Sequence, residues 1–201
     1  MFSIWKCNPA FFQLLPGCHH AAHHCQIPYF RFMQIEVKNS QLLDIDTIFE
    51  FYDLAIAHQK KVFNKHWKGF SRHLVQAEIS ESRQYKILVD GQIACVFAVT
   101  FNDQLIWGER DHDSIYIHRI VTHPNFRGFS FVKEIIKWAK DYALESQIKY
   151  IRMDTWADNQ KLLDYYTGCG FKYVGVVKLT QSEGLPKHYE GISLSLFEIV
   201  V

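Results

Sequence analysis

The sequence has little net charge, no long apolar run and no regular cysteine spacing. Each of these absences argues against a class of partner or of protein. The 201 residues carry a formal net charge of +1, so no general affinity for nucleic acid or for an anionic membrane is expected. No apolar run approaches the ~20 residues that span a bilayer. The five cysteines are an odd number without regular spacing, which fits reduced thiols in a cytoplasm better than a disulfide framework.

Residues 1–32 differ from the rest of the chain. They are rich in cysteine, histidine and aromatic residues, and they show neither a helical nor a strand period. They also lack the basic start, apolar core and small-residue cleavage site of a secretory signal. The spacing from Cys18 to Cys25 does not match the paired-ligand pattern of a zinc site, so no metal is predicted. We expect an atypical extension over 1–32, for which a start upstream of the native one is one explanation, and a folded domain over 33–201.

Strand and helix patterns mix from Met33 onward. The dipeptide Asp90-Gly91 is a strong signal for a type I′ hairpin. The mixture predicts a single α/β domain: a mixed sheet of about six or seven strands with helices on both faces. The expected strands are 34–38, 84–89, 92–101, 114–122, 148–154, 171–178 and 189–200; the expected helices are 41–65, 70–82, 130–146 and 159–168; and loops are expected at 102–113 and 180–188.

The most informative stretch runs from Ile115 to Val132. A β-rich run stops at Pro124, a short Arg127-Gly128 turn follows, and an amphipathic helix then begins. The first turn of a helix has unpaired N–H groups and the positive end of the macrodipole, and an adjacent Arg adds a charge-assisted donor. The pattern predicts a pyrophosphate site, although the turn taken alone could be a simple strand-to-helix connection.

Two segments together resemble the GNAT superfamily of N-acetyltransferases. The first, 121–132, looks like the coenzyme A motif, in which Arg or Gln is followed by x-x-Gly-x-Gly/Ala. The second, 158–171, looks like the later motif with Asn, an aromatic-Tyr pair and a closing Gly-Phe. Arg127 and Gly128 match the first motif. Ser130 stands where the motif prefers Gly, and Val132 stands where it prefers Gly or Ala. Ser130 could still donate to phosphate or cap the helix, while Val132 could crowd the site.

The resemblance implies a cofactor and a set of contacts. Acetyl-CoA would lie between the strands 114–122 and 148–154, and its pantetheine arm would pair with the first strand. Backbone N–H groups would hold the pyrophosphate, and one on the strand would polarise the acetyl carbonyl. Asn159 would contact the arm, and Tyr166 would protonate the departing thiolate. The implied cofactor contacts are Ile120, Val121, Thr122, Arg127, Gly128, Phe129, Ser130, Phe131, Val132 and Asn159.

The attacking amine must be neutral, so a base or a water chain is expected. His118, in the central strand, is the best-tuned candidate by intrinsic pKa. Three acids of the preceding loop could instead bind a cationic acceptor or relay its proton: Glu109, Asp111 and Asp113. Plainer roles stay open, since His118 could be structural, Tyr166 a core aromatic and Asn159 a helix cap.

The resemblance therefore implies an acyltransferase that moves acetyl from acetyl-CoA to a primary amine of a small molecule or peptide, by direct attack in a ternary complex. No metal, nucleic acid or membrane partner is expected. The oligomeric state stays open, although many relatives pair as dimers. Acceptor specificity would reside in the first two helices and in the loops 102–113 and 180–188. Two alternatives remain, a non-catalytic acyl-CoA-binding or regulatory module, and a metal-binding or interaction protein acting through residues 1–32.

Overall fold

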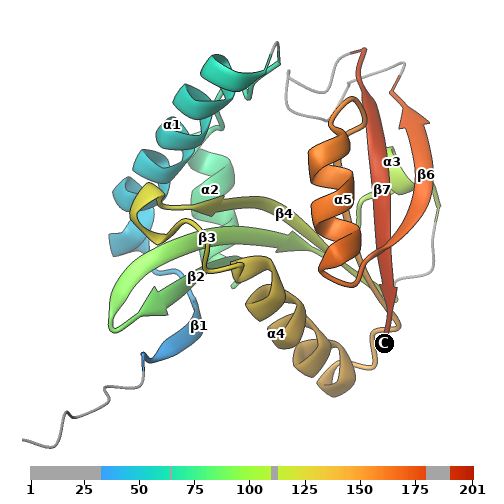
Figure 1. The fold of residues 1–201 in the computed structure, drawn as a ribbon. Helices are drawn as coiled ribbons and strands as arrows, with labels where there is room; N and C mark the ends of the chain where they lie inside the picture. The colour runs from blue at the N-terminus through green and yellow to red at the C-terminus, as the bar shows by residue number, and fades with distance from the viewer. Residues whose placement is uncertain (1–32, 64, 110–112, 180–190) are drawn as a thin grey trace, which may run out of the picture. The chain divides into compact units, whose positions relative to one another are not determined.

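One mixed sheet organises the part of the chain that the structure describes (Figure 1). The computed structural model describes residues 33–63, 65–109, 113–179 and 191–201. Within these ranges seven strands pair in the order β1-β2-β3-β4-β5-β7-β6, and all neighbours are antiparallel except β4 and β5. The strands are β1 (Ile35–Asn39), β2 (Gln84–Val89), β3 (Gln92–Thr100), β4 (Ser114–Thr122), β5 (Tyr150–Trp156), β6 (Lys172–Lys178) and β7 (Ser193–Val200). The predicted mixed α/β sheet is confirmed. The extension 1–32 and the loop 180–188 lie outside the described residues, so the domain boundary stays a prediction.

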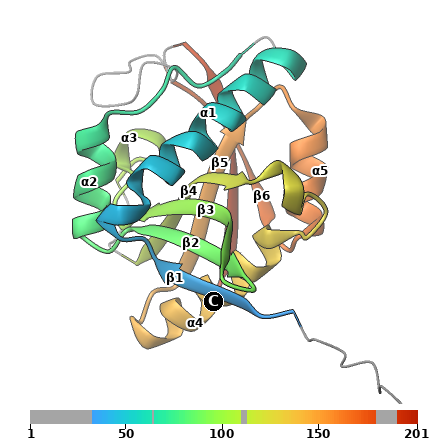
Figure 2. The same cartoon turned by 90° about the vertical axis from the view of Figure 1, so that its left-hand side faces the viewer.

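The helices cover both faces of the sheet, as expected (Figure 2). One apolar cluster packs α1 and α2 against Val96 of β3 and Val121 of β4. Another packs α4, with part of α5, against the opposite face. The helices are α1 (Ile45–Val62), α2 (Arg72–Ser80), α3 (Gln104–Trp107), α4 (Phe131–Glu145) and α5 (Gln160–Gly168), with short 3₁₀ turns at Leu42–Asp44 and Pro124–Phe126.

The structure differs from the expected elements most clearly at the start of the first helix and in the loop 102–113. The first helix was expected over 41–65, but a 3₁₀ turn occupies its start and α1 begins only at Ile45. The reason is Asp44, whose carboxylate accepts from the Gln41 N–H at 2.7 Å and pairs with Lys86 at 2.6 Å. The loop expected at 102–113 contains the short helix α3. One helical turn of four residues is too short to show a hydrophobic period.

The hairpin β2–β3 forms where the sequence predicts it. Asp90 and Gly91 both have positive φ angles, of 48° and 83°. Two left-handed residues are what a type I′ turn requires, and their twist matches that of the flanking strands. The hairpin gives β3 a fixed register beside β4, the strand on which the site depends.

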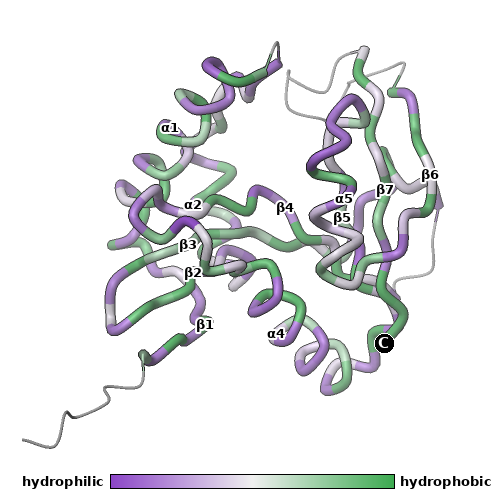
Figure 3. Tube along the Cα trace, in the orientation of Figure 1, coloured by the Kyte–Doolittle hydropathy of each residue, from purple (hydrophilic) through white to green (hydrophobic). Residues whose placement is uncertain are grey.

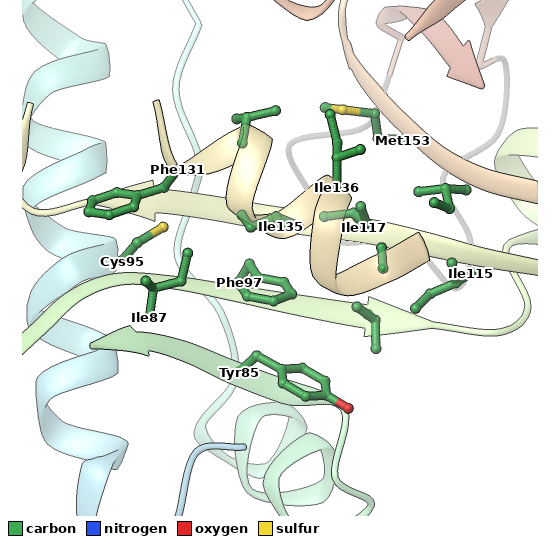
Figure 4. Close-up of a cluster of buried hydrophobic side chains, with 14 of the residues drawn as sticks. Tyr85, Ile87, Cys95, Phe97, Ile115, Ile117, Phe131, Ile135, Ile136 and Met153 are labelled. Atoms are coloured by element: carbon green, nitrogen blue, oxygen red, sulfur yellow. The ribbon is translucent and has the colours of Figure 1, made fainter. Parts of the chain in front are cut away.

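The main core lies between α4 and the sheet. Figure 4 shows Phe131, Ile135 and Ile136 of α4 beside Phe97 and Ile117 of the strands. Along α4, hydrophobic residues recur every three to four positions with hydrophilic residues between them, which is the spacing of one helix face (Figure 3). Ile135 is fully buried, and truncating such a side chain to Ala typically costs ~2–5 kcal/mol. This packing fixes the start of α4 against the sheet. Within the described ranges, no helix has both the length and the apolar character that a membrane crossing needs.

Candidate functional site

A cavity opens where β4 and β5 stop pairing. The two strands pair in parallel from Ser114 and Tyr150 as far as Ile117 and Met153, and no further register pairs follow. Beyond that point lies a cavity of about 380 Å³. Helices from both faces of the sheet reach it, because the separated strands leave an opening between them. Its lining includes His118–Thr122 of β4, Asp154–Trp156 of β5, Leu162 and Tyr166 of α5, Leu54, Ala55, His58 and Gln59 of α1, and also Phe63, Trp67, Pro124 and Arg127.

A β-bulge at Arg119 coincides with this separation. Val96 pairs with Val121 and Ala98 with His118, so two residues of β4 oppose Phe97 alone. Arg119 has a φ of 51°, which is unusual for a residue other than glycine. Its guanidinium lies 2.5 Å from the Glu78 carboxylate of α2 and over the ring of Phe70. A bulge bends its strand and increases the local twist. The bulge therefore turns the end of β4 away from a straight ladder beside β5.

The Arg127-Gly128 turn ends in two left-handed residues before α4. Gly128 has a φ of 92° and Ser130 a φ of 53°. Ser130 is the N-cap of α4, but its side chain makes no capping hydrogen bond. The expectation that its hydroxyl caps the helix is wrong, because the left-handed backbone at Ser130 replaces the extended conformation that an N-cap serine normally has. This conformation is also the physical reason for a glycine preference at position 130.

The bulk of Val132 does not face the turn. Val132 and Phe131 are both buried in the core between α4 and the sheet. The expected crowding of the site by Val132 is therefore wrong. Arg127 is exposed and lines the cavity. Among the described residues, no carboxylate lies within ion-pairing distance of Arg127, so its guanidinium is available to bind an anionic ligand.

The α5 helix brings Tyr166 to the cavity and begins at Asn159. The Asn159 side chain accepts from the Leu162 N–H at 3.2 Å, so the predicted N-cap role is confirmed. Its amide NH₂ is not used by the cap. The Tyr166 ring lies 5.5 Å from that of Phe197 and lines the cavity. Burial, together with Tyr165, Cys169 and Asp154, raises the pKa of Tyr166 above its ordinary value, so the phenol stays protonated near neutral pH.

Three titratable groups from different parts of the chain meet beside the cavity. They are Asp103 before α3, His118 on β4 and Asp154 on β5, and their ligand atoms lie within 4.8 Å of one another. His118 Nε2 is 3.6 Å from Asp103 Oδ2. Burial raises the pKa of Asp103 to about 7. Burial and the neighbouring Asp103 raise the pKa of Asp154 to about 8.

The expectation that intrinsic pKa makes His118 the best-tuned base does not fit its surroundings. Burial lowers the pKa of His118 to about 3, with help from the cations Arg119 and Arg83. An imidazole that holds a proton so weakly is a poor general base near neutral pH. The two carboxylates beside it have pKa values closer to the range in which a base works well.

Of the three acids expected to act from the loop 102–113, the structure describes Glu109 and Asp113. Glu109 is exposed and accepts from Gln104 at 3.3 Å. Asp113 accepts from the hydroxyl of Ser114 at 3.1 Å and lies 3.8 Å from Lys149. Neither lines the cavity, and Asp111 lies outside the described residues.

Of the two acids that lie beside His118, Asp103 and Asp154, only Asp154 could have been noticed from the sequence. Asp154 is a charged residue inside an otherwise apolar strand pattern, which is a reason for attention. Asp103 stands in a polar loop and has no such mark.

The donor set of Asp103, His118 and Asp154 could also hold a divalent cation, since carboxylates and imidazole are ordinary ligands. The predicted absence of a metal stays a prediction. The Cys18–Cys25 segment lies outside the described residues. Of the two helices expected to shape acceptor specificity, α1 contributes to the cavity lining and α2 does not.

Known proteins resemble the chain in sequence. Residues 48–171 match the Acetyltransferase (GNAT) family. The N-acetyltransferase YesJ of Bacillus subtilis is 26% identical over 113 residues, which cover 54% of this chain and 63% of YesJ. The chain thus spans a little less than two thirds of the length of this relative.

Solved structures resemble it in fold. An acetyltransferase of the GNAT family from Listeria monocytogenes superposes with a TM-score of 0.66 at 20% identity, covering 83% of this chain and 95% of that one. The structure of yncA from Salmonella typhimurium with its cofactor acetyl-CoA superposes with a TM-score of 0.57 at 12% identity, covering 83% and 93%. At these identities the likeness is one of fold.

Proposed function

The chain belongs to the acetyltransferase (GNAT) family of acyltransferases, and from that premise we propose that it transfers the acetyl group of acetyl-CoA to a primary amine. The amine attacks the thioester directly in a ternary complex, without an acyl-enzyme. The observation that carries the proposal is the cavity between the separated ends of β4 and β5, which Arg127 and Tyr166 both line.

The separated part of β4 suits an extended ligand. Val121 and Thr122 pair with β3 on one side, and Ile120–Thr122 line the cavity in place of any pairing with β5. An extended arm with amide groups can add to such an edge as a further strand. The pantetheine arm of acetyl-CoA has this chemistry. A β4 N–H directed at the thioester would stabilise the oxyanion that forms during attack.

The turn between β4 and α4 suits the pyrophosphate. The first N–H groups of α4 lack partners within the helix, and the helix dipole favours an anion there. Arg127 adds a charge on the cavity side. We assign the pyrophosphate contacts to the backbone from Arg127 to Val132 and the side chain of Arg127. The amide NH₂ of Asn159, which the cap leaves unused, is assigned to the arm.

Tyr166 is assigned as the general acid. When the tetrahedral intermediate collapses, the C–S bond breaks and the thiolate takes the phenolic proton. A phenol is a suitable donor, since its ordinary pKa of ~10 is close to that of a thiol at ~8.5. Burial raises the pKa of Tyr166 because it destabilises the phenolate. The same water-poor surroundings destabilise the departing thiolate and so favour its protonation.

A calorimetric titration of the full chain with acetyl-CoA tests the proposal, followed by an assay of free thiol over a panel of amines. We expect saturable one-to-one binding and amine-dependent thiol release. Binding without release for any amine would favour the alternative, a non-catalytic acyl-CoA-binding module. No heat with acetyl-CoA would overturn the proposed function altogether.

A further inference from the structure

Three phenylalanines lie in the short stretch 126–131 at the turn before α4: Phe126, Phe129 and Phe131. Phe131 is buried in the main core and Phe126 packs against it, whereas Phe129 is 37% exposed. The pyrophosphate contacts proposed above use the backbone of this turn and the side chain of Arg127. The exposed ring of Phe129 has no part in them, so it is available for another contact.

The ring of Phe129 is held in one plane by its neighbours and by the backbone. It stacks on Phe131 with the ring centroids 5.5 Å apart and 16° between the planes, and Phe126 meets it edge to face at 5.8 Å. The residues on either side, Gly128 and Ser130, both have left-handed backbone angles. Because Phe131 lies against one face of the ring, the exposed area belongs mainly to the opposite face. A flat apolar surface is thus presented to solvent in a preorganised position.

The covalent structure of coenzyme A places its adenosine outside the cavity. The pyrophosphate joins the pantetheine arm on one side to the adenosine on the other. The proposed function assigns the arm to the cavity and the pyrophosphate to the turn, so the adenosine emerges on the outer side of the turn. Phe129 is exposed and does not line the cavity. We therefore expect its ring and the adenosine on the same side of the pyrophosphate.

The surroundings of Phe129 suit a nucleotide better than a protein partner. Two exposed cations stand close to it in sequence, Arg127 before it and Lys133 in the first turn of α4 after it. Adenosine in coenzyme A combines a flat aromatic base with phosphate groups, and these match an aromatic face beside cations. A stable protein interface needs ~800 Å² from each partner. One exposed ring, whose aromatic neighbours pack into or against the core, supplies only a small part of that area.

We propose that the outward face of Phe129 is the platform on which the adenine ring of acetyl-CoA stacks. The inference rests on the proposed function and adds a side-chain contact to the backbone contacts assigned there. The platform also affects the choice of donor, since the chain should prefer acetyl-CoA to an acetyl thioester of phosphopantetheine that lacks the adenosine. A stacked ring recognises the flat face of the base and not its hydrogen-bonding edges.

The test measures the affinity of the full chain for two donors by calorimetry. One is acetyl-CoA, and the other is S-acetyl-4′-phosphopantetheine, which keeps the arm and one phosphate but has no adenosine. Phe129→Ala should bind acetyl-CoA about tenfold more weakly, as is usual when an aromatic side chain that stacks on a base is removed. Its affinity for S-acetyl-4′-phosphopantetheine should equal that of the wild type. The preference for acetyl-CoA should therefore shrink by the same factor.

Two further substitutions separate stacking from apolar packing. Phe129→Tyr keeps the aromatic face and should retain the affinity for acetyl-CoA. Phe129→Leu keeps an apolar side chain without an aromatic face and should behave like Phe129→Ala. If Phe129→Ala does not fold, Phe129→Leu provides the same comparison between the two donors.

Phe101→Ala is the matched control. Phe101 is 36% exposed and stacks on Tyr142 with the ring centroids 5.9 Å apart and 21° between the planes. It thus resembles Phe129 in exposure and in stacking on a neighbouring ring, but it lies outside the turn. Its removal should leave the affinities for both donors unchanged, and a loss equal to that of Phe129→Ala would overturn the inference.

The comparison of donors also separates the inference from the proposed function. Equal losses for both donors in Phe129→Ala would mean that the ring only supports the turn, and unchanged affinity for acetyl-CoA would mean that it contacts no base. Either result overturns the inference, while binding of acetyl-CoA by the wild type leaves the proposed function standing. A wild type that does not bind acetyl-CoA would remove both.

Discussion

The cavity has two halves that are built from different kinds of sequence. The half to which the proposed function assigns the cofactor, called the cofactor half, follows the chain without interruption from the end of β4 through the Arg127-Gly128 turn into α4. The other half includes His118 and Asp154, which come from two strands, and a ligand atom of Asp103, from a loop, lies within 4.8 Å of theirs. A continuous half can be identified from a motif, since its geometry is local. A discontinuous half is visible only when the sheet brings its parts together.

Arg119 lies at the β4 bulge beside His118 and holds a buried ion pair, so its removal should have the largest effect. Arg119→Leu leaves the buried Glu78 carboxylate without its 2.5 Å partner. We expect a loss of ~3–5 kcal/mol in the free energy of unfolding, as for a broken buried pair. Urea denaturation measures it.

Arg72→Leu is the matched control for Arg119→Leu. The Arg72–Asp46 pair is exposed on both sides, so its loss should cost no more than ~1 kcal/mol. Equal losses in the two variants would mean that the bulge does not depend on the buried pair.

Tyr166→Phe distinguishes chemistry from cofactor binding. The ring keeps its contacts with Phe197 and Phe171, so acetyl-CoA affinity should barely change. Turnover should fall about tenfold or more, because the phenolic proton is lost. Steady-state kinetics and calorimetry measure the two quantities. Unchanged turnover would remove Tyr166 from the mechanism.

Arg127→Ala should affect the cofactor half alone. The side chain is exposed, so screening by solvent reduces its contribution, and we expect acetyl-CoA to bind about tenfold more weakly. Lys140→Ala, an exposed cation further along α4, should leave the affinity unchanged. Similar losses in both variants would indicate a general attraction of the anion in place of a specific contact.

Ser130→Gly tests the backbone of the turn. Because Ser130 has a φ of 53°, glycine should relieve strain and stabilise the fold by up to ~1 kcal/mol. Ser146→Gly, at the other end of α4 with a φ of −96°, should be neutral or destabilising. Thermal unfolding of both variants measures the difference, and a destabilised Ser130→Gly would contradict the assignment of strain.

Deletion of residues 1–32 should have the smallest effect. We propose that the domain begins at Met33, so the truncated chain should keep its stability within ~0.5 kcal/mol. It should also keep its affinity for acetyl-CoA. A large drop in the thermal midpoint would show that the first 32 residues belong to the folded domain.

The sequence by itself determined the order of the strands and of the four longer helices, the Asp90-Gly91 hairpin and the turn before α4. These features depend on local periodicity and on the φ angles that particular residues adopt, and both can be read along the chain. It also placed Tyr166 and Asn159 on the same helix, since a single periodic segment contains both.

Only the tertiary structure decided what surrounds His118 and which acids lie beside it. The pKa of His118 depends on burial and on Arg119 and Arg83, and Asp103, from the loop after β3, helps to raise the pKa of Asp154 on β5. Electrostatic interactions act across space between residues far apart in the chain. Their sum is therefore fixed only once the strands have been brought together.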